Sequence, residues 1–177
     1  MVDFSFNKKN FKLGVIGLGY IGATLALEFS KKVKTIGYDI SASRVDQLKK
    51  KIDKNLEISK KDFERAETHK IFTNVSNDLS KCNIFIITVP TPVTKKNKPD
   101  LKYIKNAIAL VCKYIKKKDI IVLESTVYPG LTENLCNKYI QSRTKLKLNK
   151  DFFCGYSPER VNPGDKKNNL KNLTKVI

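Results

Sequence analysis

The chain has 177 residues, and its 35 lysines and arginines against 17 acidic residues give it a formal net charge of +18. A hydrophobic share of 41% favours a folded domain over a disordered chain, and the sequence holds no apolar run long enough to span a membrane. Its first residues, MVDFSFNKKNF, lack the apolar segment of a secretory leader, so we expect a cytoplasmic protein.

Short apolar runs alternate along the chain with segments of helical periodicity. In the first half, strands are predicted at residues 12–16, 33–38 and 71–73. Helices are predicted at residues 20–30, from a cap at Ser41 to about 52, and at 60–67.

The second half continues the alternation. We predict a strong strand at residues 83–89, a polar loop at 93–99, and a helix capped by Asp100 with apolar positions as far as Ile115. A strand at 119–123, a helix at 132–142 and a strand at 152–155 follow. The last residues, 174–177, have the pattern of a strand that is just beginning, so we expect a longer parent protein.

This order of elements predicts the fold class. Repeated β-α units with continuously apolar strands are typical of a parallel sheet that helices cover on both faces, with right-handed crossovers. We therefore predict a doubly wound α/β sheet of the Rossmann type, with about six strands.

A glycine motif follows the first predicted strand and opens the first predicted helix. Gly17, Gly19 and Gly22 form G-x-G-x-x-G, the pattern of a dinucleotide-binding turn in that context. Gly17 permits the tight turn, Gly19 lets the backbone approach a pyrophosphate, and Gly22 lets the helix pack close to the sheet. The N–H groups at the start of the helix would then face the phosphates.

Asp39 ends the second predicted strand, where a carboxylate accepts hydrogen bonds from the adenosine ribose. An acid at this position repels a 2′-phosphate, so the sequence favours NAD over NADP. Arg44 follows on the next helix, and we expect it either to stack on the adenine or to pair with Asp39.

Three polar segments follow later strands: VPTP at residues 89–92, ESTVYPG at 124–130 and YSPERVNPG at 156–164. In open α/β sheets ligands bind beyond the carboxyl ends of the strands. We therefore expect one group of side chains to converge at the nicotinamide end of the site: Thr91, Ser125, Thr126, Glu159 and Arg160.

Metal and nucleic-acid sites are not favoured. The four cysteines, Cys82, Cys112, Cys136 and Cys154, form no C-x-x-C pair, and His69 is the one histidine, so we predict reduced thiols and no metal. The lysine runs are short and aromatic residues do not interleave with them, so we expect no nucleic-acid partner. The excess charge instead favours a small anionic ligand.

The glycine loop and the three polar segments, in this order, resemble the UDP-glucose/GDP-mannose dehydrogenase family from about Lys12 to Ile177. ESTVYPG and YSPERVNPGD are most similar to its UDP-N-acetylhexosamine 6-dehydrogenase branch. The resemblance implies that residues 1–177 are an N-terminal NAD-binding domain. It also implies an enzyme that oxidises a sugar C6 from alcohol to carboxylate with two NAD, for bacterial capsule and O-antigen polysaccharides.

The resemblance also implies roles for single residues. Cofactor-contacting positions of the family match Tyr20, Ile21, Asp39, Thr91 and Thr126. Glu159 matches a carboxylate that acts on the hydrolytic water, which Thr126 helps to hold, and a carboxylate suits such proton transfer. The segment that contacts the nucleotide sugar matches Glu159, Arg160, Val161 and Asn162.

The chain departs from the family pattern in one respect that matters for activity. Family members use a nucleophilic cysteine in a glycine-rich motif further along the chain, and Cys154 lacks that context. The central helix and the C-terminal UDP-binding domain also fall outside this sequence. We therefore expect this chain to bind NAD without turning over substrate, and the parent to be a homodimeric enzyme.

Two alternatives remain at this point. One keeps the fold and changes the reaction, as in UDP-glucose or hydroxyacid dehydrogenases. The other is a non-enzymatic nucleotide-binding or nucleic-acid-binding module, which a steep salt dependence of DNA affinity would favour.

Overall fold

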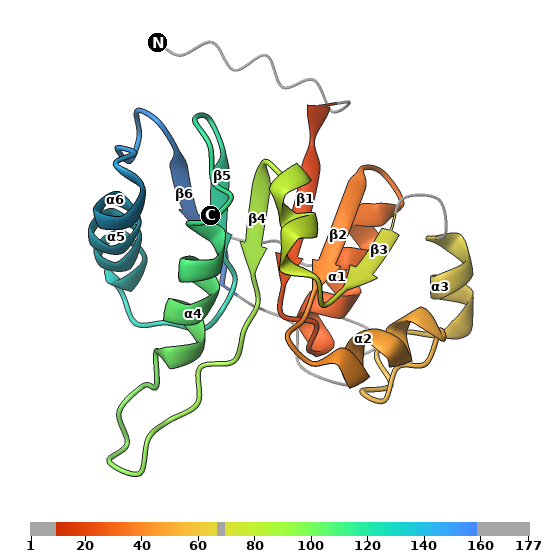
Figure 1. Ribbon diagram of the computed structural model, residues 1–177. Coiled ribbons are helices and arrows are strands. Elements are labelled where there is room, and N and C mark those ends of the chain that lie inside the picture. The colour runs from red at the N-terminus through yellow and green to blue at the C-terminus, as the bar shows by residue number, and fades with distance from the viewer. Residues whose placement is uncertain (1–9, 67–69, 159–177) are drawn as a thin grey trace.

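The computed structural model describes residues 10–66 and 70–158. Within these ranges six parallel strands form one sheet in the order β3-β2-β1-β4-β5-β6, which crosses Figure 1 from right to left. The predicted doubly wound α/β fold is confirmed. The strands are β1 (Lys12–Ile16), β2 (Lys34–Tyr38), β3 (Lys70–Thr73), β4 (Ile84–Ile87), β5 (Ile120–Leu123) and β6 (Phe153–Tyr156).

The helices that connect the strands mostly lie where the periodicity places them. They are α1 (Tyr20–Ser30), α2 (Ala42–Lys49), α3 (Lys60–Arg65), α4 (Lys102–Val111), α5 (Leu131–Leu135) and α6 (Gln141–Thr144). Ser41 caps α2 as predicted, because its hydroxyl accepts a hydrogen bond from the N–H of Arg44 at 3.3 Å.

The structure differs from the predicted helices in the following details. A 3₁₀ helix, η2 (Ser76–Lys81), precedes β4, and a π-helical turn, η3 (Cys136–Ile140), interrupts the helix expected at 132–142. The predicted extension of α4 to Ile115 is wrong, because the N–H groups of Lys113 and Tyr114 bond three residues back and tighten the chain into turns. Asp100 is not the cap residue of α4, which is Leu101, although the Asp100 carboxylate still accepts from the N–H of Lys102 at 2.9 Å.

Side chains that alternate along the strands supply a core on each face of the sheet. In β4, Phe85 and Ile87 face the core covered by η2, α4 and α5, whereas Ile86 faces the core covered by α1, α2 and α3. This period of two is the ordinary geometry of a strand buried on both faces. The sheet is therefore buried on both faces, one core lying on each side.

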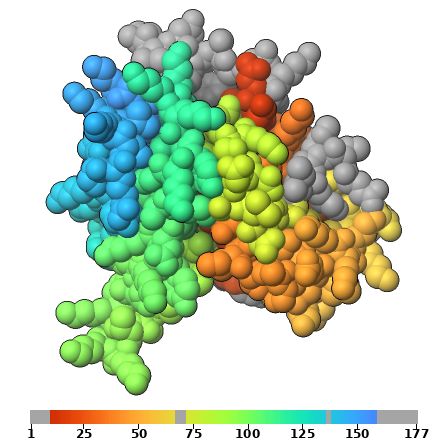
Figure 2. Space-filling model, viewed as in Figure 1, coloured from red at the N-terminus to blue at the C-terminus, as the bar shows by residue number. Residues whose placement is uncertain are grey.

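The carboxyl ends of the strands point to the lower edge of Figure 1. The connection from β4 to α4 leaves this edge as a hairpin, closed by pairing between Val93 and Pro99. The hairpin extends well beyond the body of the molecule at the lower left of Figures 1 and 2. Among the described residues, no helix is both long and apolar enough to cross a membrane.

Asp119 lies at the opposite edge, just before β5, and its side chain bears on stability. The residue is 4% exposed, its carboxylate accepts from the N–H of Lys116 at 2.7 Å, and burial raises its pKa from 3.8 to about 6. Because the folded state favours the protonated acid, this group contributes stability at low pH. That contribution is lost as the pH rises from about 4 through 6.

We expect the Asp119→Asn variant to lack this loss, since an amide oxygen can still accept from Lys116 and carries no charge. The variant should therefore gain about 1–2 kcal/mol over the unaltered protein at pH 7 and little at pH 4. Urea unfolding of the two proteins from pH 4 to 7 measures this difference. A difference in unfolding free energy that does not change with pH would contradict the expectation.

Candidate functional site

The turn between β1 and α1 is held in a conformation that only glycine adopts easily. Gly17 has φ +95° and its N–H donates to Tyr38 O at 2.9 Å. A Cβ on Gly22 would lie 1.8 Å from Gly17 O and 2.3 Å from Thr88 Oγ1. The helix and the turn therefore touch through backbone atoms, as the predicted motif requires.

Thr88, which follows β4, fastens this turn, and the sequence analysis missed it. Its hydroxyl donates to Gly17 O at 2.7 Å and lies 3.1 Å from Ile16 O. The one signal that could have found it is a hydroxyl-bearing residue within the otherwise apolar run IFIITV. Thr88 thus links the end of β4 to the glycine loop through a hydrogen bond.

The space in front of Gly19 is open. No heavy atom of the described residues would lie within 4 Å of a Cβ at this position, in contrast to the crowding at Gly17 and Gly22. The first backbone hydrogen bond of α1 runs from Ala23 N to Gly19 O, so the N–H groups before Ala23, from Tyr20 onward, lie at the positive end of the helix. Backbone amides beside an open space can receive a phosphate group.

Asp39 follows β2, and the structure brings it next to the glycine loop. Its carboxylate accepts from Leu18 N at 2.7 Å and from Ser41 N at 2.8 Å. Its other two lone-pair positions accept no hydrogen bond from the described residues, and a hydroxyl group is a suitable donor for them. Burial, followed by the nearby Asp39 charge, raises the pKa of Tyr38 above 10.0, so that phenol stays neutral.

Arg44 reaches the glycine loop from α2, but the expected alternative of a pair with Asp39 is wrong. Its Nε donates to Leu18 O at 2.7 Å, and its Nη2 lies 2.8 Å from Asp53 Oδ1. Asp39 already binds two backbone N–H groups, whereas the buried Asp53 carboxylate requires a cation. Nη1 of Arg44 is buried and has no hydrogen-bond partner among the described residues.

The ends of β4 and β5 bring three predicted residues together. Thr91 Oγ1 donates to Thr126 O at 2.8 Å, and Ser125 Oγ donates to Val89 O at 2.6 Å. Thr126 is exposed, whereas Ser125 is 6% exposed and its proton is committed to the backbone. The Thr126 side chain is thus exposed at this edge of the sheet, whereas Ser125 ties the two strand ends together.

The segment after β6 starts at the same edge. Ser157 N donates to Leu123 O at 3.0 Å, which continues the sheet pairing beyond β6. The predicted site residues Glu159, Arg160, Val161 and Asn162 lie outside the described residues. No group of three potential metal ligands occurs in the parts of the chain that the structure describes.

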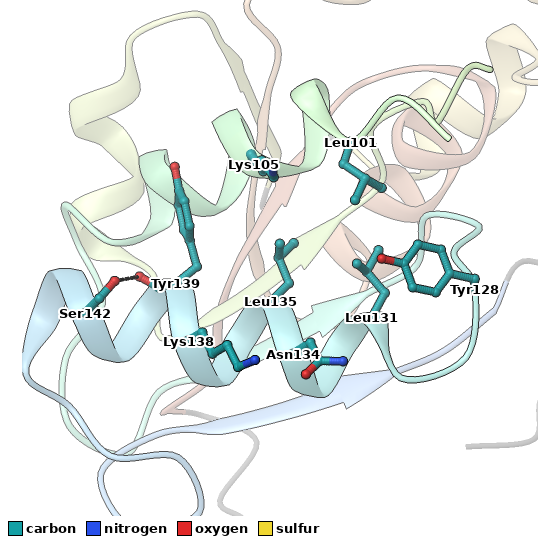
Figure 3. A pocket seen from close by; sticks show the side chains of 9 residues that line it. All are labelled: Leu101, Lys105, Tyr128, Leu131, Asn134, Leu135, Lys138, Tyr139 and Ser142. Atoms are coloured by element: carbon teal, nitrogen blue, oxygen red, sulfur yellow. Dashed lines mark hydrogen bonds between the residues drawn. The ribbon is translucent and has the colours of Figure 1, made fainter. Parts of the chain in front are cut away.

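A separate groove of about 360 Å³ lies between α4 and the α5–η3 segment (Figure 3). Its lining is Leu101, Lys105, Tyr128, Leu131, Asn134, Leu135, Lys138, Tyr139 and Ser142. None of these residues belongs to the glycine loop, so the groove is a different feature from the site described above.

The strand order, the glycine loop that opens α1 and the fixed carboxylate after β2 together define a dinucleotide-binding Rossmann domain. Residues 11–177 match the family model of the UDP-glucose/GDP-mannose dehydrogenase family, NAD binding domain. The chain belongs to this family, and its cofactor is NAD.

Individual relatives agree with that assignment. The chain is 45% identical over 168 residues to the UDP-N-acetyl-D-glucosamine 6-dehydrogenase of Pseudomonas aeruginosa, which covers 95% of this chain and 40% of the relative. It is 42% identical to the enzyme of the same name from Salmonella typhi, over 97% of this chain and 40% of the relative. This chain thus spans about two fifths of the length of the curated relatives it matches.

A solved structure supports the fold independently. The UDP-D-ManNAc dehydrogenase from Pyrococcus horikoshii superposes with a TM-score of 0.81 at 32% identity, over 87% of this chain and 37% of that one.

The described residues fit NAD. The open space at Gly19 admits a pyrophosphate next to the N-terminus of α1, and Asp39 keeps acceptor positions for ribose hydroxyls. Arg44 adds a cation beside the glycine loop, since its Nε donates to Leu18 O at 2.7 Å. Each of these features is what the anionic and hydroxyl groups of the dinucleotide would bind.

Proposed function

We propose that this chain is the cofactor-binding part of a UDP-N-acetylhexosamine 6-dehydrogenase, with UDP-N-acetylglucosamine as substrate. The observation that carries the proposal is the glycine-loop site, together with 45% identity to a UDP-N-acetyl-D-glucosamine 6-dehydrogenase over 95% of the chain. The product class would be a uronic acid for a bacterial surface polysaccharide.

In this proposal the adenosine half of NAD lies between the glycine loop and Asp39. The pyrophosphate lies beside Tyr20 and Ile21, in the space that Gly19 leaves open, and the backbone N–H of Ile21 donates to it. Asp39 accepts from the ribose hydroxyls, and Arg44 borders the same half of the site. Bound NAD supplies the hydride acceptor for the sugar C6.

The substrate half lies at the ends of β4, β5 and β6. Thr91 and Ser125 shape the nicotinamide end, and the exposed Thr126 hydroxyl orients a water for which Glu159 is the base. The proposal gives substrate contacts to Glu159, Arg160, Val161 and Asn162. A carboxylate and a guanidinium beside each other suit water activation and diphosphate binding.

The parent protein is proposed to be a cytoplasmic homodimer. Four cysteines without a C-x-x-C pair are consistent with reduced thiols in a reducing compartment. Nucleic acid is not part of the proposal, because NAD and a nucleotide sugar account for an excess of positive charge.

We expect this 177-residue chain to bind NAD and to give no steady NADH production with a UDP-sugar. The physical reason is that thioester chemistry needs an activated cysteine, and no cysteine here has the family's glycine-rich surroundings. Calorimetry measures the binding of NAD, and the absorbance of NADH measures turnover of the UDP-sugar. Sustained NADH formation by this chain would contradict the second part.

The substrate is tested on a longer protein that includes this chain. UDP-N-acetylglucosamine, UDP-N-acetylgalactosamine, UDP-N-acetylmannosamine and UDP-glucose are compared by kcat/KM. The proposal predicts the highest value for UDP-N-acetylglucosamine. A clear preference for another sugar would move the protein to a different branch of the same family.

A further inference from the structure

The loop from Asp53 to Ile58, between α2 and α3, lies next to the glycine loop, although neither its composition nor its spacing resembles a cofactor motif. The loop is organised around the side chain of its first residue, Asp53, which is 1% exposed. A buried carboxylate is costly unless every oxygen is hydrogen-bonded and a cation is paired with it.

Asp53 satisfies that condition completely. Oδ1 accepts from Asn55 N at 3.2 Å and from Arg44 Nη2 at 2.8 Å. Oδ2 accepts from Glu57 N at 2.9 Å and from Ile58 N at 3.1 Å. Since all four lone-pair positions are used, Asp53 has none left for a ligand, and three backbone bonds keep it from turning.

The Asp53 carboxylate holds the Arg44 side chain between the glycine loop and the loop from Asp53 to Ile58. The guanidinium binds Leu18 O through Nε at 2.7 Å and Asp53 through Nη2. With its amide turned so that both polar atoms are satisfied, Asn55 Oδ1 also accepts from Arg44 Nη2 and from Tyr20 N, each at 3.2 Å. The loop therefore meets both the arginine and the first N–H of α1.

One nitrogen of the guanidinium, Nη1, is not engaged in these contacts. Nε and Nη2 are engaged, and the buried Nη1 has no partner among the described residues. An arginine side chain loses much rotamer freedom when it is held in place. Here the contacts with Asp53 and Leu18 already restrict the rotamers of Arg44 in the unliganded protein. A ligand that contacts Arg44 therefore does not bear that entropy cost.

We propose that Asp53 is a positioning residue for NAD, acting through Arg44 rather than by touching the cofactor. The proposal rests on the proposed function of the glycine-loop site. Asp53 holds the guanidinium against Leu18 O, on the adenosine side of the site, and its loop sets Asn55 at the start of α1.

The test is a double-mutant cycle on NAD affinity, measured by calorimetry. In Asp53→Asn the amide oxygen can still accept from Glu57 N and Ile58 N, but the amide N–H₂ then faces Arg44 and the anionic partner of Arg44 is lost. In Arg44→Met the stem is kept and the guanidinium removed. We expect each single variant to bind NAD about tenfold more weakly, and the double variant to bind no more weakly than Arg44→Met alone.

Asp46→Asn is the matched control, because Asp46 is an exposed carboxylate on the same helix as Arg44. It should bind NAD like the unaltered protein. Unchanged affinity in Asp53→Asn, or losses that add in the double variant, would overturn the proposal, since Asp53 would then act without Arg44.

Failure of the proposed function gives a different result, in which the unaltered protein does not bind NAD. If Asp53→Asn does not fold, Arg44→Lys carries the test with Asp53 intact. One ammonium cannot bridge Leu18 O and Asp53 as the planar guanidinium does, so affinity should again fall about tenfold. Unaltered affinity in Arg44→Lys would overturn the proposal.

Discussion

Replacing Gly22 with alanine is expected to abolish NAD binding and to destabilise the protein by about 3 kcal/mol or more. The added Cβ would lie 1.8 Å from Gly17 O and 2.3 Å from Thr88 Oγ1. Both atoms are constrained, the first by the turn and the second by its hydrogen bond to Gly17, so neither can move aside cheaply. Either α1 leaves the sheet or the glycine loop opens.

Gly19→Ala is the informative partner to this variant. No atom from the part of the chain that the structure describes lies within 4 Å of its Cβ, so the protein should unfold at nearly the same urea concentration as the unaltered one. Its methyl group would nevertheless stand where the pyrophosphate approaches, and NAD affinity should fall at least tenfold. Full NAD affinity in Gly19→Ala would show that the dinucleotide does not cross this position.

The second large effect is expected at Asp39. In Asp39→Asn, the amide N–H₂ must face either Leu18 N or Ser41 N, where the carboxylate now accepts. The loss of charge-assisted acceptors for ribose hydroxyls should weaken NAD binding by about 1.5–3 kcal/mol, roughly tenfold to a hundredfold. NADP should lose less, because the variant no longer repels a 2′-phosphate.

Calorimetric titration with NAD and NADP measures both affinities for the unaltered protein and for Asp39→Asn. Asp46→Asn changes the net charge equally on an exposed side chain of α2, and it should leave both affinities alone. An unchanged ratio of NAD to NADP affinity in Asp39→Asn would show that the carboxylate does not select the cofactor.

Local patterning was enough to predict the first β-α unit. The boundaries of β1 and α1 coincide with the apolar run and the helical stripe that the sequence shows, because the glycines force the turn between them. The parallel sheet followed from the same reasoning, since strands buried on both faces have few other arrangements.

Prediction failed where distant parts of the chain decide the structure. Arg44 pairs with Asp53 rather than Asp39 because burial, which a sequence pattern does not reveal, leaves Asp53 in need of a cation. The π-helical turn between α5 and α6 likewise has no local marker of the kind that Ser41 provides for α2.

The candidate site divides in the same way. Glycines and the acid after β2 were predictable because each serves the backbone geometry of a known turn. Thr88 and Asp53 act through hydrogen bonds to atoms brought close only by folding, so their positions in the sequence carry weak signals.

The strand order has a consequence for how the protein forms during synthesis. β1 is central and pairs with β2 on one side and β4 on the other, so Leu13 reaches its partner Ile84 only after most of the first half has left the ribosome. Until then one edge of β1 offers unpaired N–H and C=O groups to any neighbouring chain. A nascent polypeptide halted after β3 should therefore self-associate or recruit a chaperone, whereas one halted after β4 should have this edge closed.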